Sequence, residues 1–171
     1  AVTVTPQMQA LLAEEHMVLM EDTASAFTAT GSVGSIVLGN ALANVMVSSQ
    51  AAADELYGLG GNDTLIAKGS GDLLGGGEGD DVLRTDSPYD RTTFIGGPGN
   101  DTITGSYYGD TYRFNRGDGQ DTVYERNVGY SEADILQFGA DVLPGDVTPI
   151  RSGEDLIFKI SNSTDQITFK D

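Results

Sequence analysis

Cysteine and tryptophan are absent from this chain, histidine occurs once, and basic residues are few. Without cysteine no disulfide can form, and zinc would lack its usual thiolate and imidazole ligands. No stretch approaches the roughly 18 consecutive apolar residues that are typical of a membrane span. With 9 basic and 26 acidic residues the formal charge is -17, which argues against nucleic acid or an anionic membrane as a direct partner.

Glycine and aspartate are abundant instead, and they recur in a nine-residue repeat. Residues 76–84 and 96–104 are its clearest copies, and each reads Gly-Gly-x-Gly-x-Asp-x-apolar-x, where x is any residue. The same phase, with a carboxylate in the sixth place and an apolar residue in the eighth, holds in further units: 49–57, 58–66, 67–75, 105–113 and 116–124. A weaker copy covers 39–47, and the unit 87–95 lacks the aspartate. Such a repeat is a sequence signature of calcium-binding parallel β-helices.

The place of each residue in the unit predicts its role. Glycine tolerates positive φ and a close backbone approach, so the first five places form a tight loop whose carbonyls point at one spot. The last three places form a short strand whose middle residue points opposite to its neighbours. We therefore expect an all-β fold, a parallel β-roll with the eighth-place residues in its core: Leu56, Leu65, Leu74, Leu83, Phe94, Ile103, Tyr112 and Val123.

Two units make one coil, so the loops on one edge of the roll come from every second unit. The aspartates are divided between the edges as follows: Asp63, Asp81, Asp101 and Asp121 on one, and Asp54, Asp72 and Asp110 on the other. Loops on one edge stack about 4.8 Å apart, so two carboxylates and several backbone carbonyls surround each gap. Oxygen ligands at flexible geometry favour calcium over the stricter octahedral magnesium.

The predicted cofactor is therefore Ca2+, bound as several ions. The candidate ligands are the loop residues that would supply carboxylate or carbonyl oxygens: Asp54, Gly58, Gly60, Gly61, Asp63, Asp72, Gly76, Gly77, Glu78, Gly79, Asp81, Gly96, Gly97, Pro98, Gly99, Asp101, Asp110, Gly117, Asp118, Gly119 and Asp121. We expect good sites from Asp63 to Asp121 and poorer ones on the opposite edge. There Asp54 lacks neighbouring glycines, and Thr92 stands where an aspartate should be. Whether Asp90 replaces that aspartate stays open.

A flexible acidic linker is the alternative interpretation of this composition. The apolar residue in every ninth place argues against it for the metal-bound state, because a linker has no reason to keep register. Without metal the crowded carboxylates repel one another, and cation binding supplies folding free energy. We expect a chain that is largely unfolded at cytosolic calcium and folded at extracellular calcium, with affinities on the order of 10⁻⁴ to 10⁻³ M.

Residues 39–171 resemble an RTX (repeats-in-toxin) domain, the calcium-binding tail of proteins that Gram-negative bacteria export by type I secretion. Beyond the nonapeptides, the segment 109–125 (GDTYRFNRGDGQDTVYE) is similar to the terminal segment of the family, and three later segments resemble its C-terminal cap: 134–138, 151–160 and 165–171. The resemblance implies a secreted, extracellular protein, the type I secretion machinery as a partner, and a cap that nucleates folding. It also implies that Asp110 begins the last rung and that 117–121 is the last metal loop.

The chain divides into three parts by this interpretation: an N-terminal helix and connector (1–38), the β-roll (39–124) and the capping flank (125–171). The expected helix follows Thr5 and Pro6, with an apolar stripe at Met8, Leu11, Leu12, Leu19 and Met20. His16 is expected on its surface or in its packing. Within the cap, the alternation of Leu156, Phe158 and Ile160, and of Ile167 and Phe169, predicts strands with one buried face.

Three classes of function are compatible with these patterns. The first is a structural and export module that folds on calcium outside the cell and supports an activity elsewhere in a larger toxin, adhesin or exoenzyme. The second is a glycan-binding module, similar to those of some alginate epimerases or adhesins, in which an anionic polysaccharide or host surface meets a basic strip: Lys68, Arg84, Arg113, Arg116 and Arg126. An enzyme is the third, and no pairing of nucleophile and base supports it.

Overall fold

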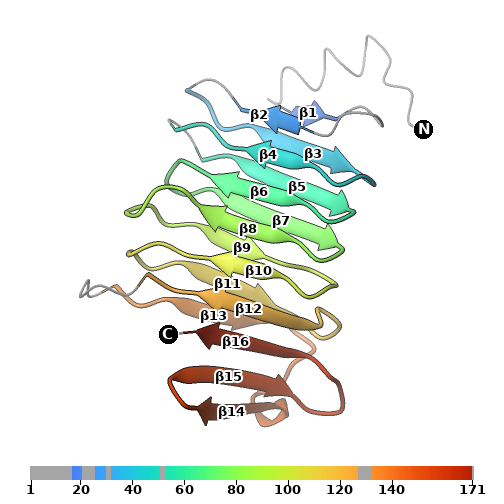
Figure 1. Cartoon of the computed structure of the whole chain (residues 1–171), viewed down its shortest axis with the longest axis vertical. Helices are drawn as coiled ribbons and strands as arrows, with labels where there is room; N and C mark the ends of the chain where they lie inside the picture. Colours follow the sequence, from blue (N-terminus) through green and yellow to red (C-terminus); the bar gives the residue numbers. More distant parts are fainter. Residues whose placement is uncertain (1–16, 21–25, 30–31, 51–52, 127–131, 171) are drawn as a thin grey trace.

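Short strands alternate between two sheets and wind into a solenoid in the computed structural model, which describes residues 17–20, 26–29, 32–50, 53–126 and 132–170 (Figure 1). One sheet contains, in spatial order, β1 (Met17–Leu19), β3 (Ile36–Asn40), β5 (Glu55–Gly60), β7 (Leu73–Glu78), β9 (Thr93–Ile95), β11 (Thr111–Phe114) and β13 (Ile135–Phe138). The facing sheet contains β2 (Ala26–Thr28), β4 (Val45–Val47), β6 (Thr64–Ala67), β8 (Val82–Thr85), β10 (Thr102–Thr104) and β12 (Gln120–Tyr124), followed by the strands of the cap. The predicted all-β parallel roll is confirmed.

Strand register places the eighth residue of each unit on top of the same residue two units away. Leu65 pairs with Leu83, Leu83 with Ile103, and Ile103 with Val123 along one sheet. The side chains in the eighth place of the repeat unit are at most 2 % exposed. Because stacked residues of one type bury the same apolar surface in every coil, a short repeat is enough to build a continuous core.

The C-terminal cap continues both sheets in parallel and then adds antiparallel strands to the second sheet. β13 pairs in parallel with β11, and β16 (Gln166–Lys170) pairs in parallel with β12. β15 (Asp155–Ile160) then pairs antiparallel with β16, and β14 (Val147–Ser152) pairs antiparallel with β15. The predicted cap strands are confirmed, although Leu156 is 38 % exposed and only Phe158 and Ile160 of its alternating set face the core.

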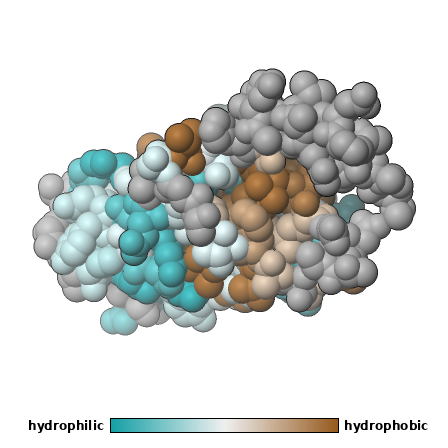
Figure 2. All heavy atoms as spheres, turned by 90° about the horizontal axis from the view of Figure 1, so that it is seen from above, coloured by the Kyte–Doolittle hydropathy of each residue, from teal (hydrophilic) through white to brown (hydrophobic). Residues whose placement is uncertain are grey.

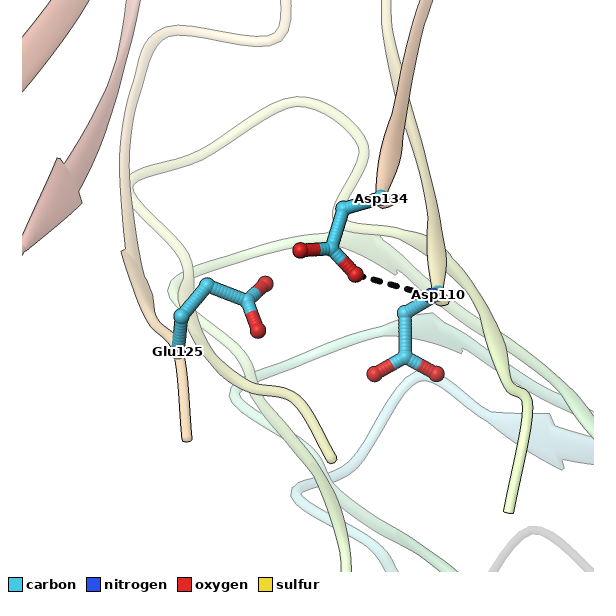
Figure 3. A group of neighbouring side chains, drawn as sticks. All are labelled: Asp110, Glu125 and Asp134. Atoms are coloured by element: carbon cyan, nitrogen blue, oxygen red, sulfur yellow. Dashed lines mark hydrogen bonds between the residues drawn. The ribbon is translucent and has the colours of Figure 1, made fainter. Parts of the chain in front are cut away.

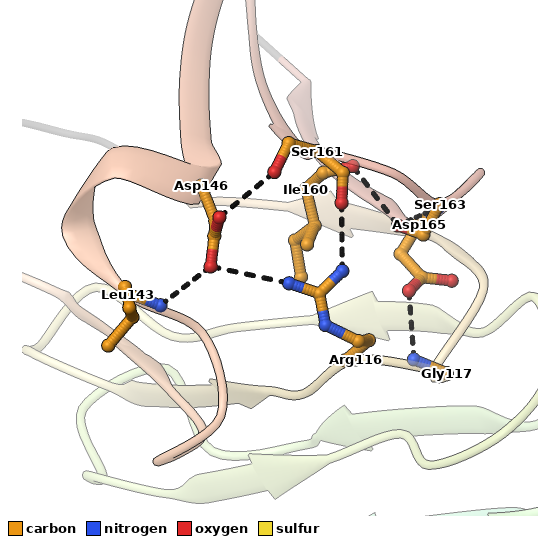
Figure 4. Close-up of polar contacts among 8 residues, drawn as sticks. All are labelled: Arg116, Gly117, Leu143, Asp146, Ile160, Ser161, Ser163 and Asp165. Carbon is orange, nitrogen blue, oxygen red and sulfur yellow. Dashed lines mark hydrogen bonds and ion pairs between the residues drawn. The ribbon is translucent and has the colours of Figure 1, made fainter.

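Aromatic and polar contacts attach the cap to the last coil. Phe169 meets the ring of Tyr112 edge-on at 5.4 Å, and Phe158 meets Phe169 at 6.1 Å. On the other side Arg116 donates a hydrogen bond to the Ser161 carbonyl at 2.8 Å and forms an ion pair with Asp146, as Figure 4 shows. Asp146 ends the 3-10 turn Pro144–Asp146, and Gly117 N donates to Asp165. The exposed rung of the solenoid is thus covered at this end.

The N-terminal part differs from the expected helix and connector. Leu19 ends strand β1, which pairs in parallel with β3, and Met20 N donates to Leu38 O. β2 lies inside the expected connector and pairs with β4. The helical assignment of Leu19 and Met20 was therefore wrong. Thr5, Pro6, Met8, Leu11, Leu12 and His16 lie outside the described residues.

Hydrophobic residues are exposed at this end of the solenoid, on which Figure 2 looks down. Val33, Leu42 and Val45 belong to its first strands and turns and are 44 to 55 % exposed. In the described part of the chain no helix is long and apolar enough to cross a membrane. The division of the chain at residues 38 and 124 stays a prediction.

Candidate metal centre

The glycine loops of one edge connect each strand of the first sheet to the next strand of the second. The candidate ligands of this edge lie in four such turns, which include the strand ends beside them: 58–63 from β5 to β6, 76–81 from β7 to β8, 96–101 from β9 to β10, and 117–121 from β11 to β12. Gly77 and Gly79 adopt φ of 108° and 130°, a region that side chains disfavour. At Gly76 a Cβ would stand 2.6 Å from Gly96 O and closer still to the Asp81 carboxylate. The loops therefore stack only because these positions have no side chain.

The sixth-place aspartates of this edge form a ladder of hydrogen bonds. Asp81 Oδ1 accepts from Asp63 N at 2.7 Å, Asp101 Oδ1 from Asp81 N at 2.8 Å, and Asp121 Oδ1 from Asp101 N at 3.0 Å. The ladder begins at Asn44, whose N donates to Asp63 Oδ1 at 2.7 Å. All four aspartates are at most 2 % exposed. The structure thus brings together the carboxylates that the sequence assigned to this edge.

The second carboxylate oxygens of this ladder are left without protein partners. Asp63 Oδ2, Asp81 Oδ2 and Asp101 Oδ2 are buried and have no hydrogen bond. Burial raises the pKa of Asp63 and Asp81 to about 6, of Asp101 to about 7 and of Asp121 to about 8. A buried oxygen that lacks a donor is unfavourable unless a proton or a cation meets it, so these residues fit a hard divalent cation.

Backbone carbonyls beside the carboxylates already take part in stacking the loops. Glu78 O accepts from Gly61 N, Gly96 O from Gly77 N, and Pro98 O from Gly79 N, each at 2.9 Å. A carbonyl has two lone pairs, so one such bond leaves an acceptor site free. Asp118 differs from the other candidates because its side chain accepts from Asn115 N and Nδ2, within its own loop.

The aspartates of the opposite edge have both oxygens occupied by the chain itself. Asp72 Oδ2 accepts from Ser48 Oγ and from Gly69 N, and Asp54 Oδ2 accepts from Ser49 N at 2.6 Å. Their Oδ1 atoms continue a ladder like that of the first edge, with Asp54 N donating to Asp72 Oδ1 at 2.8 Å. These carboxylates therefore have less need of a cation than those from Asp63 to Asp101.

Thr92 itself occupies the buried place of the missing aspartate. It is 2 % exposed, its N donates to Asp110 Oδ1 at 2.7 Å, and its hydroxyl has no hydrogen-bond partner. Asp110 Oδ2 accepts from Ser106 N at 2.7 Å. The opposite edge is thus continuous in hydrogen bonds through Thr92 but lacks one carboxylate there.

Two features were missed by sequence reasoning. A second ladder of hydrogen bonds runs beside the first and is formed by the exposed residues in the fifth place of each repeat unit. Asn100 N donates to Asp80 Oδ1, and Asp80 N donates to Asn62 Oδ1. The recurrence of Asn or Asp in this place was the available signal. The second feature is a group of acids, Asp110, Glu125 and Asp134, of which only Asp110 was predicted as a ligand.

The basic residues proposed for a glycan-binding strip do not all lie on one sheet. Arg84 lies in β8 of one sheet and Arg113 in β11 of the other. Arg84 forms an ion pair with Asp86, and Arg116 is engaged by the cap. Ion pairs within the chain therefore account for Arg84 and Arg116.

Comparison with protein families matches residues 50–84 and 90–111 to the RTX calcium-binding nonapeptide repeat, in four copies. Comparison with curated proteins found no match. The matched residues include the loops of Asp63 and Asp81 and the strands β5 to β8. The family repeat is a structural calcium-binding module. The four repeat matches and the β-solenoid architecture together fit an RTX-type calcium-binding domain.

Proposed function

We propose that the chain is a calcium-responsive folding module, in which ions along the edge from Asp63 to Asp121 convert an unfolded acidic chain into the β-roll. The observation that carries this proposal is the row of buried carboxylates whose Oδ2 atoms have no protein partner. Two successive carboxylates and the loop carbonyls between them would hold each ion. The remaining candidate glycines of these loops would contribute backbone carbonyl oxygens, and their lack of a side chain allows the loops to stack closely.

Electrostatics supports a fold that depends on the cation. The chain has a formal charge of -17, and desolvation raises the pKa values of the ladder aspartates far above their usual range. At neutral pH the calcium-free fold must either keep protons on these groups or bury charges next to one another, and both oppose folding. An ion that binds only the folded arrangement shifts the equilibrium by mass action.

Such a switch suits export by type I secretion. In a cytosol poor in calcium the chain would stay unfolded and able to pass through the secretion machinery, and outside the cell it would fold. The chain would then support a toxin, adhesin or exoenzyme whose activity lies elsewhere in a larger secreted protein. No catalytic step is assigned to the residues described above.

Circular dichroism tests the proposal directly. The far-UV spectrum should change from a largely disordered form in EDTA to a β form in millimolar calcium, and magnesium at the same concentration should be much less effective. An identical spectrum in EDTA and in calcium would contradict calcium-driven folding.

The cap is proposed to start the folding of the roll. It covers the last rung with Phe158 and Phe169, and it is tied to that rung through Arg116. A chain truncated after Glu125 should need much more calcium to fold or should not fold at all. A truncated chain with the calcium midpoint of the full chain would show that the cap has no such role.

A further inference from the structure

We propose a second kind of calcium site on the opposite edge, formed by Asp110, Glu125 and Asp134 together with the hydroxyl of Tyr112, where the last coils meet the cap. Asp110 precedes β11, Glu125 follows β12 and Asp134 precedes β13. The three acids therefore come from the two sheets and converge at one loop edge, as Figure 3 shows. The proposal rests on the proposed function only in taking calcium as the ion.

The carboxylates are close enough to share one ion. One oxygen from each of the three acids lies within 4.8 Å of the other two. Asp110 N donates to Asp134 Oδ1 at 3.0 Å, which fixes the two loops relative to each other. Among the described residues, no lysine or arginine forms an ion pair with any of the three. Three carboxylates therefore meet without a compensating charge.

The Tyr112 hydroxyl is an independent indication of a ligand at this point. The side chain is fully buried, and its ring stacks on Phe94 at 5.5 Å. The hydroxyl and Glu125 Oε2 both lie beside Gly105, but their geometry does not make a hydrogen bond, and the hydroxyl has no other partner among the described residues. Glu125 Oε1 is likewise buried and without a partner. Buried polar atoms are seldom left unpaired, so a further group is expected between them.

Oxygens of Asp110, Glu125 and Tyr112 surround one point. A Cβ placed on Gly105 would stand 2.9 Å from both Asp110 Oδ2 and Glu125 Oε2, and closer still to the Tyr112 hydroxyl. Glycine at this position leaves the space between the three oxygens open. The side chain of Glu125 thus brings an oxygen to a place where the repeats of the other edge rely on backbone carbonyls.

The donor set favours calcium among the common cations. Every donor is an oxygen, and three are carboxylates, which suits a hard divalent ion and not zinc. Asp134 is exposed, so water can complete an irregular shell of six to eight oxygens, which calcium accepts more readily than magnesium.

An ion at this point would join the roll to the cap. Glu125 and Asp134 line a groove of about 460 Å³, together with Phe158 of β15 and Phe169 of β16 from the cap. Tyr112 connects the two features, because its ring meets Phe169 edge-on at 5.4 Å. Calcium bound by the acids would therefore fix the end of β12, the start of β13 and the rung on which the cap packs.

Calorimetric titration of the full chain with calcium tests the site through three variants. Glu125→Gln should bind one ion fewer than the wild type. Glu154→Gln makes the same chemical change in an exposed residue of the same groove and should bind the full number. Asp101→Asn removes a ligand of the first edge and reports on that edge alone.

Terbium, which replaces calcium and is excited through nearby tyrosine, gives a second measurement that does not depend on the folding of the Glu125 variant. Tyr112→Phe keeps the stacked ring and removes the hydroxyl. It should lower the tyrosine-sensitised emission and weaken the binding of one ion, with circular dichroism in saturating calcium unchanged.

The outcomes separate the two sites. Full calcium stoichiometry in Glu125→Gln, or unchanged terbium emission in Tyr112→Phe, would overturn the second site and leave the first edge standing if Asp101→Asn loses calcium. Loss of one ion in Glu125→Gln with no loss in Asp101→Asn would support the second site and contradict the proposed ions of the first edge.

Discussion

Replacing Asp101 by asparagine should have opposite effects with and without calcium. Asp101 is 1 % exposed, its Oδ1 accepts from Asp81 N, and its Oδ2 has no hydrogen bond. An asparagine carbonyl can take over the bond from Asp81 N. The substitution therefore removes a buried charge and a proposed calcium ligand while it keeps the ladder.

The effect of Asp101→Asn on the stability of the calcium-free fold can be worked out from the pKa of Asp101. Burial raises the pKa of Asp101 from 3.8 to about 7. One pKa unit corresponds to about 1.4 kcal/mol, so at pH 8 the aspartate lowers the free energy of unfolding by about 4 kcal/mol. The amide that replaces Oδ2 lacks an acceptor, which returns about 1 to 2 kcal/mol of that gain. We expect the calcium-free fold to gain about 2 to 3 kcal/mol.

With calcium present, Asp101→Asn should instead destabilise the fold, because Asp101 lies beside two successive gaps of the ladder and the variant would lose a calcium ligand at each. The assay is far-UV circular dichroism at pH 8 in EDTA and over a calcium titration. Asp101→Asn should show more β signal in EDTA and a higher calcium midpoint than the wild type. Asp80→Asn is the matched control, since Asp80 is exposed and adjacent to the ladder. Equal behaviour of the two variants in both conditions would refute the reasoning.

Three further results are expected from the same physics. Because the folded state raises the pKa of Asp121 from 3.8 to about 8, it binds more protons than the unfolded chain between these values; in EDTA the fold should be most stable near pH 4 and lose stability progressively as the pH rises to about 8, as circular dichroism would show. Phe158→Ala removes a ring that packs against the core, so urea unfolding in calcium should show a loss of about 2 to 3 kcal/mol, against under about 1 kcal/mol for the exposed Leu156→Ala. Gly76→Ala places a Cβ against a carbonyl and a carboxylate and should raise the calcium midpoint strongly, whereas Gly145→Ala, which meets nothing within 4 Å, should leave the midpoint within error.

The central roll was predictable because one rule acts in every unit. An apolar residue in the eighth place, such as Leu83 or Ile103, has only the interior to occupy when coils stack, and a period of two units per coil fixes the edge on which each loop lies. The same period placed Asp81 next to Asp101 without any long-range information. Whether these residues bind the ions as proposed stays a prediction.

The repeat pattern could not predict the N-terminal strands or the hydrogen bonds of the opposite edge. Met17–Leu19 has no glycine loop after it, and a short apolar run is as compatible with a helix as with a strand until the pairing with β3 is known. Ser48 and Ser106 reach the carboxylates of Asp72 and Asp110 through contacts that no spacing indicates. Sequence marked the loop of Asp54 as poor in glycine, and structure adds a separate reason for weaker sites at Asp54 and Asp72, whose carboxylate oxygens already accept hydrogen bonds from the chain.

The hydrogen bonds of the first edge have a direction, and it bears on where folding begins. Each aspartate accepts from the backbone of the coil before it: Asp121 from Asp101 N, Asp101 from Asp81 N, and Asp81 from Asp63 N. A coil therefore finds its acceptor only when the coil on its C-terminal side is in place. The last acceptor, Asp121, lies in β12, which β16 of the cap covers by parallel pairing. Folding that spreads from the cap toward the N-terminus would therefore provide the Oδ1 acceptor of each ladder N–H before its own coil is added, whereas the bonds between strands, such as Thr102 N to Asp81 O, run the other way.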